Sequence, residues 1–250
     1  HANYLVTLAI AKFAVVDVGG PASARPGLPM PVYVPWGNEK NVQDVFGSTP
    51  DMIAFFEKRF GVPYPWDQYA QVCVRDFSAG GMENTSATFL TVGTSNPADP
   101  GDRDDLISHE LAHQWFGDYV TCNSWEHLWL NEGWASFAEC LWNEHKAAAM
   151  GENPSAKRGR DAYLKSVLGY MRQMRQRSRS SLPAAIPMAS KRYNDPDAVF
   201  TKPDDPYAKG ASILHMLRER LGDDAFFAGT TNYLKAHAFS AAESDDIRRA

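Results

Sequence analysis

The order of hydrophobic and polar positions predicts strands in the first part of the chain and helices in the rest. Residues 4–16, YLVTLAIAKFAVV, alternate in the manner of a strand, although no partner strand is evident nearby. Apolar positions at helical spacing over residues 41–60 predict a helix that is interrupted at Ser48-Thr49-Pro50. Runs of β-branched and aromatic residues predict further strands over residues 32–36, 71–75 and 86–92.

From residue 104 onward the pattern is mainly helical. We expect helices over residues 104–116, 126–145, 155–177, 207–221 and 224–236. Strands followed by helices are the layout of the α+β class. Residues 19–31, GGPASARPGLPMP, are rich in glycine and proline and predict a linker. We therefore expect residues 1–18 to be the tail of a preceding β domain and residues 19–250 to form the main domain.

Composition narrows the class of protein. The chain has 250 residues, of which 44% are hydrophobic and 22% charged, as in a globular protein. Its net charge of −5 argues against nucleic acid or an anionic membrane as the partner, because such binding requires a positive surface. The basic stretch 157–180 carries no nucleic-acid-binding motif and predicts a solvated helix face or a surface that meets another domain.

No apolar run approaches the roughly 20 residues of a membrane span. The three cysteines indicate neither a disulfide scaffold nor a CxxC zinc site.

The stretch HELAHQWFGD, residues 109–118, carries the candidate chemistry. Residues four apart share a helix face, so His109 and His113 project side by side and can both reach one metal ion. Glu110 is turned by about 100° around the helix axis and lies beside the metal, where the general base for a metal-held water belongs. The alternative interpretation is a helix that merely buries two hydrogen-bonded histidines.

A third ligand is expected, because catalytic zinc usually has three protein ligands and one open position. Glu132 follows His113 after 18 intervening residues and lies on the next predicted helix. Its surroundings in LWLNEGWASF are apolar, and a buried carboxylate there is costly without a partner. Gly133 beside it permits a close backbone approach. Two histidines and a glutamate are also the ligand set of thermolysin. A surface glutamate is the alternative.

Together these segments resemble the gluzincin zinc metallopeptidases, and specifically the aminopeptidase N family, which includes leukotriene hydrolase-like relatives. The similarity continues upstream in YPWDQYAQVCVRDFSAGGMEN and downstream in PYAKGASILHML, and it covers residues 62–217. The resemblance implies a thermolysin-like metallopeptidase catalytic domain of the α+β class, with a small mixed-sheet lobe followed by a mainly helical lobe. It also implies one bound Zn²⁺, together with contacts to an N-terminal β domain and a C-terminal domain that we expect to lie outside this chain.

The segment GGMEN, residues 80–84, resembles the exopeptidase signature of the family, which implies that Gly80, Gly81, Met82, Glu83 and Asn84 bind substrate. Paired glycines let a backbone lie close to another chain. The charge of Glu83 is not needed by zinc, but it suits the ammonium of a free peptide N-terminus. Fixing that ammonium sets the distance from the first peptide bond to the metal, which makes cleavage exo. A hairpin-like turn with a solvated glutamate is the alternative.

The resemblance also implies a hydroxyl donor for the oxyanion that forms when a peptide carbonyl is attacked. The segment DDPYAKGAS resembles the corresponding segment of the family, so Tyr207 is the expected donor, and Tyr193 is the second choice. Pro206 and Tyr207 open a predicted helix, which is a rigid place for a catalytic phenol. Asp118 and Glu139 are candidates for orienting the metal ligands, and a solvated role for either is equally compatible with the sequence.

The function predicted from the sequence is zinc-dependent removal of the N-terminal residue from peptides with a free N-terminus, with Glu110 as general base. Two alternatives remain open. One is a thermolysin-like endopeptidase, against which Glu83 argues. The other is a catalytically weak isolated domain that acts as a binding module. The presence of His109, Glu110, His113 and Glu132 argues against that second alternative.

Overall fold

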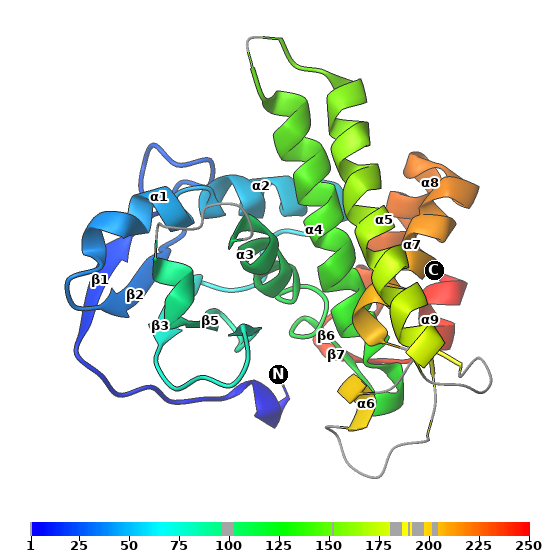
Figure 1. The fold of residues 1–250 in the computed structure, drawn as a ribbon, viewed down its shortest axis with the longest axis horizontal. Helices are drawn as coiled ribbons and strands as arrows, with labels where there is room; N and C mark the ends of the chain where they lie inside the picture. Colours follow the sequence, from blue (N-terminus) through cyan, green and yellow to red (C-terminus); the bar gives the residue numbers. More distant parts are fainter. Residues whose placement is uncertain are drawn as a thin grey trace. The chain divides into compact units, whose positions relative to one another are not determined.

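The computed structural model describes residues 2–96, 103–151, 153–180, 187–189, 191, 198–201 and 205–250 (Figure 1). The chain divides into two compact units, residues 1–119 and residues 120–250. The first unit contains a mixed sheet and three α-helices within its described residues, and the second is mainly helical. The α+β class expected from the sequence is therefore confirmed.

The first unit is built on a five-stranded sheet in the order β1-β2-β3-β5-β4. Strand β1 is antiparallel to β2, the strands β2, β3 and β5 are parallel, and β4 is antiparallel to β5. The short strand β4 therefore lies at one edge of the sheet. The strands are β1 (Phe13–Asp17), β2 (Pro31–Pro35), β3 (Ala70–Val74), β4 (Gly81–Met82) and β5 (Ala87–Thr91).

The helices of the first unit bury an aromatic core. The ring of Trp115 meets the rings of Phe56, Phe60 and Tyr64 edge to face, and Phe60 also meets Phe116. Such packing combines burial of large apolar surfaces with favourable ring geometry. The helical elements are η1 (Asn3–Leu5), η2 (Glu39–Asn41), α1 (Val42–Phe46), α2 (Thr49–Phe60), η3 (Val92–Ser95) and α3 (Arg103–Ala112).

In the second unit, helix α4 packs against both α5 and α7. Gly133 of α4 faces Gly210 of α7 so closely that a methyl group on Gly133 would stand 2.8 Å from the Gly210 Cα. A two-stranded parallel ladder joins β6 and β7. The elements are β6 (Val120–Cys122), η4 (Trp125–His127), α4 (Trp129–Ala149), α5 (Ala156–Ser180), α6 (Ala198–Thr201), α7 (Pro206–Leu221), α8 (Asp223–Ala236), β7 (Ser240–Ala242) and α9 (Ser244–Arg249).

Two predicted elements differ from the structure. The strand expected over residues 4–16 is confined to β1, which begins at Phe13 and has β2 as its partner. The alternating Leu8 and Ile10 before it are 80% and 89% exposed, so their pattern does not mark a ladder. The helix expected over 104–116 ends at Ala112, because the chain tightens and then turns at Gly117, whose φ of +139° suits glycine. The interruption near Pro50 is confirmed, since α1 ends at Phe46 and α2 begins at Thr49.

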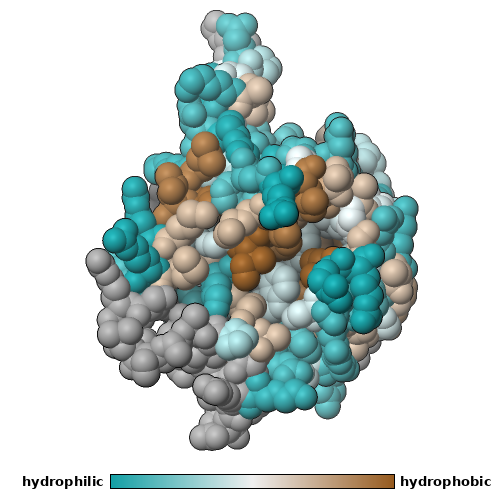
Figure 2. Space-filling model, turned by 90° about the vertical axis from the view of Figure 1, so that its right-hand side faces the viewer, coloured by the Kyte–Doolittle hydropathy of each residue, from teal (hydrophilic) through white to brown (hydrophobic). Residues whose placement is uncertain are grey.

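The surface mixes polar and apolar side chains. Figure 2 shows one face, on which apolar residues lie among hydrophilic ones. Within the described residues, no helix combines the length and the apolar character that crossing a bilayer requires.

The three cysteines are free thiols, with Cys73 and Cys140 buried and Cys122 half-buried, as expected from a chain without a disulfide scaffold.

Candidate functional site

Helix α3 and the turn after it carry the two histidines. His109 lies in the last turn of α3, and His113 follows the helix end, yet its N–H still reaches the His109 carbonyl over 3.3 Å. The two rings therefore remain neighbours, with centroids 4.9 Å apart and planes at 76°. Both side chains are buried, at 8% and 1% exposure. The pairing expected from the four-residue spacing survives the early end of the helix.

The backbone fixes the tautomer of His113. Its Nδ1 lies 2.9 Å from the Phe116 carbonyl oxygen, which can only accept a hydrogen bond. Nδ1 therefore carries a proton and donates it, and in the neutral ring the lone pair is on Nε2. Metal-binding histidines are commonly oriented in this way through the ring nitrogen that does not bind the metal.

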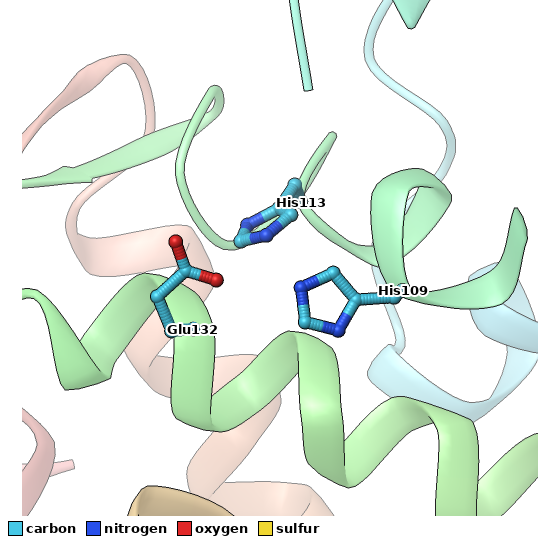
Figure 3. Close-up of side chains that lie close together, drawn as sticks. All are labelled: His109, His113 and Glu132. Carbon is cyan, nitrogen blue, oxygen red and sulfur yellow. The ribbon is translucent and has the colours of Figure 1, made fainter. Parts of the chain in front are cut away.

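Figure 3 draws the two histidines with Glu132, the third residue expected from the sequence. Each of the three offers a ligand atom, and these atoms lie within 4.8 Å of one another. Glu132 belongs to the first turn of α4 and is 7% exposed. Nitrogen and carboxylate donors in this combination suit zinc.

A second cluster lies wholly within the first unit. Glu83, Glu110 and His113 also offer ligand atoms within 4.8 Å of one another. The two carboxylates are only 6% and 5% exposed. Two buried carboxylates at this separation repel each other when both are ionised, so the cluster favours a cation between or beside them. The sequence predicted both acids as functional residues, and the structure brings them together.

The absence of a side chain at Gly81 leaves the space that the Glu110 carboxylate occupies. A methyl group on Gly81 would overlap the Glu110 carboxylate, so the side chain lies directly against the backbone of β4. At Gly80 a methyl group would meet only Leu106, at an ordinary 3.6 Å. The need for glycine is therefore specific to Gly81. In this structure the group close to its backbone is Glu110, whereas the sequence had suggested a substrate chain.

Buried amide side chains hold the turn that carries Glu83. Gln114 donates to the Glu83 carbonyl over 3.2 Å and accepts from the Ser86 N–H over 2.8 Å. Asn84 donates to the carbonyl of Leu5, in η1, over 2.9 Å. Gln114 is not predicted as a site residue from the sequence, where its only signal is a polar residue directly after His113. Its partners lie about thirty positions earlier in the chain, which no local pattern reveals.

Asp118 faces the same cluster. It is 2% exposed, and its N–H donates to the His113 carbonyl over 3.0 Å. Burial raises the pKa of the Asp118 carboxyl well above its ordinary value, and the neighbouring Glu83 raises it further, while His113 acts in the opposite direction. The pKa of Tyr69 is raised chiefly by burial and also by Glu110 and Asp118. Burial and the neighbouring carboxylates therefore both oppose additional negative charge at this cluster.

The remaining predicted residues lie in the second unit. Tyr207 is half-buried in the first turn of α7, where the Asp205 side chain caps the helix by accepting from the Tyr207 N–H over 3.1 Å. Tyr193 lies outside the described residues. Glu139 accepts a hydrogen bond from Tyr170 of α5 over 2.5 Å, which directs its carboxylate toward that helix.

Comparison with known proteins gives the class to which this chain belongs. A family model for the peptidase family M1 domain matches residues 45–250. That range is well over half of the 250 residues, so the chain belongs to peptidase family M1. The resemblance drawn from the HELAHQWFGD, LWLNEGWASF and GGMEN segments is confirmed at this level.

Individual relatives agree with the family. The chain is 34% identical over 255 residues to Aminopeptidase 2, mitochondrial, of Saccharomyces cerevisiae, covering 98% of this chain and 25% of the relative. It is 35% identical over 211 residues to Aminopeptidase N of Streptomyces lividans, covering 81% and 23% respectively. It is 32% identical over 255 residues to Glutamyl aminopeptidase of Bos taurus, covering 98% and 25%. The chain therefore spans about a quarter of the length of these relatives.

Proposed function

We propose that this chain is the zinc-binding catalytic domain of an aminopeptidase, with a thermolysin-like arrangement of sheet and helices. The observation that carries the proposal is the convergence of His109, His113 and Glu132 on one small space, with Glu110 and Glu83 beside His113. Membership of peptidase family M1 and the aminopeptidase names of its relatives support the reaction class.

The donor set fits zinc. Two imidazoles and one carboxylate give three protein ligands and leave a position open, as in catalytic zinc sites. All three side chains are buried, and the hydrogen bond from His113 Nδ1 to the Phe116 carbonyl makes Nε2 the metal-binding atom of the neutral ring. When bound, zinc would supply Lewis acidity and lower the pKa of a coordinated water toward about 7.

Side chains of this chain carry out proton transfer, oxyanion stabilisation and substrate binding. The Glu110 carboxylate takes a proton from the attacking water and delivers it to the nitrogen of the leaving amine. The Tyr207 hydroxyl donates a hydrogen bond to the oxygen that becomes negative as the peptide carbonyl is attacked. Glu83 pairs with the ammonium of the substrate, while the edge strand β4 offers backbone groups beside it. Gly80, Gly81, Met82 and Asn84 complete this substrate-binding turn.

The first experiment measures zinc. The chain purified after incubation with Zn²⁺ and dialysis is expected to retain one ion, and Glu132→Ala is expected to retain little. Glu139→Ala, which removes a carboxylate from the same helix, is the matched control and is expected to keep the ion. Equal zinc in all three proteins would contradict the proposed ligand set.

The second experiment distinguishes an aminopeptidase from an endopeptidase. We expect hydrolysis of amino-acyl amides with free amines and no hydrolysis after N-acetylation, because Glu83 requires a positive partner. Glu83→Ala should weaken turnover of the free-amine substrates far more than any cleavage of blocked peptides. Cleavage of acetylated peptides at internal bonds with undiminished rate would favour the endopeptidase. A folded, zinc-loaded chain that cleaves neither substrate type would favour a binding module.

A further inference from the structure

The N-terminal turn of α4 is fastened to a segment more than a hundred positions later in the chain. The Ser244 hydroxyl, at the start of α9, lies 2.8 Å from the indole nitrogen of Trp129 and 2.9 Å from Nδ1 of His127. Both aromatic partners are buried, at 6% and 8% exposure. Glu132 is three positions after Trp129, in the same first turn of the helix.

The directions of these hydrogen bonds follow from the donors present. An indole N–H can only donate, so the Ser244 oxygen accepts from Trp129. The Ser244 backbone N–H also donates to His127 Nδ1 over 3.4 Å, so Nδ1 is an acceptor and accepts a hydrogen bond from the Ser244 hydroxyl as well. The proton of the ring is then on Nε2, which faces Glu126 Oε1 over 3.2 Å. Ser244 thus donates and accepts at once, which a hydroxyl can do and a methyl group cannot.

Contacts with β6 and α7 hold the same first turn of α4 in addition. The Asn131 carboxamide oxygen accepts from the Cys122 N–H of β6 over 3.2 Å. Strand β6 pairs with β7, and Asn123 continues that pairing by donating from its backbone to the Ala242 carbonyl over 2.9 Å. Gly133 lies against Gly210 of α7. Glu132 therefore stands between residues whose positions are set by β6, α7 and α9, all in the second unit (Figure 1).

From this arrangement we propose that Ser244 is a positioning residue for the proposed zinc ligand Glu132. Acting through Trp129 and His127, it holds the first turn of α4 in the rotation and height that aim the Glu132 carboxylate. The inference rests on the proposed function, because it takes Glu132 as a ligand. It adds that the β7–α9 segment, far from the HExxH stretch in sequence, sets the affinity of the metal site.

The test is zinc affinity measured by competition with a chelator on the full chain. Ser244→Ala is expected to bind zinc about tenfold more weakly, which is the lower end of the loss caused by removing groups that orient metal ligands. Ser244→Thr keeps the hydroxyl and is expected to stay near the wild-type value. Ser240→Ala is the matched control, because it removes an exposed serine hydroxyl that donates to His237 in the same segment and leaves α4 untouched.

Two further measurements keep the result decisive. Trp129→Phe keeps an aromatic ring and removes the indole N–H donor. It is expected to weaken zinc binding as Ser244→Ala does, and it tests the inference if Ser244→Ala does not fold. Hydrogen exchange should show faster exchange of amides 129–133 in Ser244→Ala, with unchanged rates in the middle of α5. Wild-type zinc affinity in a folded Ser244→Ala or Trp129→Phe variant would overturn the inference. Loss of zinc binding by wild type, or its persistence in Glu132→Ala, would instead contradict the proposed function.

Discussion

At the scale of single residues, Glu110 shows how closely neighbouring groups constrain a side chain of the candidate site. Glu110 lies in the space that a methyl group on Gly81 would fill, and it is nine-tenths buried beside Glu83 and His113. A glutamate in that position is poorly placed for an ordinary surface ion pair. Its position fits proton transfer near a metal.

Glu110→Gln is the first test at this scale. The amide has nearly the same shape but cannot take a proton, so we expect turnover to fall by about 10²–10⁴-fold while zinc content stays the same. Metal analysis and steady-state kinetics on one preparation measure both quantities. Full activity in this variant would remove Glu110 from its assigned role.

Tyr207→Phe tests the oxyanion donor. The ring and its place in the capped first turn of α7 are kept, and only the hydroxyl is lost. If this hydroxyl stabilises the oxyanion, kcat should fall by about 10²–10³-fold with little change in KM. A nearly normal kcat would move the role to another donor, with Tyr193 the next to be tested.

Gln114 supports the turn that carries Glu83, and Gln114→Leu removes both of its hydrogen bonds to that turn. We expect KM for free-amine substrates to rise by roughly tenfold, equivalent to about 1.4 kcal/mol, while zinc content is unchanged. Gln71→Leu is the control, since Gln71 is equally buried in the same unit but donates to Thr49. An unchanged KM in Gln114→Leu would show that the turn holds its shape without this residue.

At the scale of elements, the contact between α4 and α7 places the proposed ligand and the proposed donor. A methyl group on Gly210 would stand 2.6 Å from the Gly133 Cα, and one on Gly133 would meet Gly210 at 2.8 Å. These are backbone atoms of two helices, so no side chain can yield to relieve the overlap. The glycines therefore set the separation of the helices that begin near Glu132 and Tyr207.

Gly210→Ala should accordingly lower the free energy of unfolding by about 1–3 kcal/mol through overpacking. Gly169→Ala is the control, because Gly169 lies in α5 with open space around it and should gain about 0.4–1 kcal/mol from the same change. Urea unfolding followed by circular dichroism measures both values. Equal effects of the two substitutions would contradict the close helix contact.

The sequence predicted most of the elements and failed where tertiary contacts decide. Helix periodicity located α5, α7 and α8, because each has a buried and an exposed side. It also located α4, although nearly all of residues 129–142 are buried. It overextended α3, since the residues after Ala112 are as buried as those before it and the spacing does not register the turn at Gly117. Short elements such as β4, β6 and β7 were missed, because two or three residues contain no period.

The candidate site followed the same division. His109, Glu110, His113 and Glu132 are visible from spacing and from charge among apolar residues. Gln114 and Ser244 are not visible in this way, because their hydrogen-bond partners lie about thirty and more than a hundred positions away in the chain. Local sequence patterns therefore predict candidate catalytic and metal-binding residues more readily than the residues that position them.

At the scale of the whole molecule, the reactivity of the free thiols can be used to follow the unfolding of each unit separately. Cys73 lies in β3 of the first unit and Cys140 in α4 of the second, and both are fully buried. Burial raises the pKa of the Cys73 thiol to about 12, so very little thiolate forms near neutral pH. Cys122 is the half-buried member of the three.

We therefore expect iodoacetamide at pH 8 to modify Cys122 first in the native protein. Cys73 and Cys140 should react only as denaturant opens the unit that contains each. Peptide mapping by mass spectrometry against denaturant concentration follows the three sites in one experiment. Rapid labelling of Cys73 under native conditions would contradict its burial in the sheet.

The bond from Asn84 to the carbonyl of Leu5 has a practical consequence. Leu5, near the start of this chain, supports the loop with Glu83 and Asn84 that is proposed to bind substrate amines. Shortening the polypeptide by half a dozen residues, a routine step in preparing samples, would take away that support. An apparent loss of affinity in such a trimmed preparation would then reflect the trimming and not the chemistry of the site.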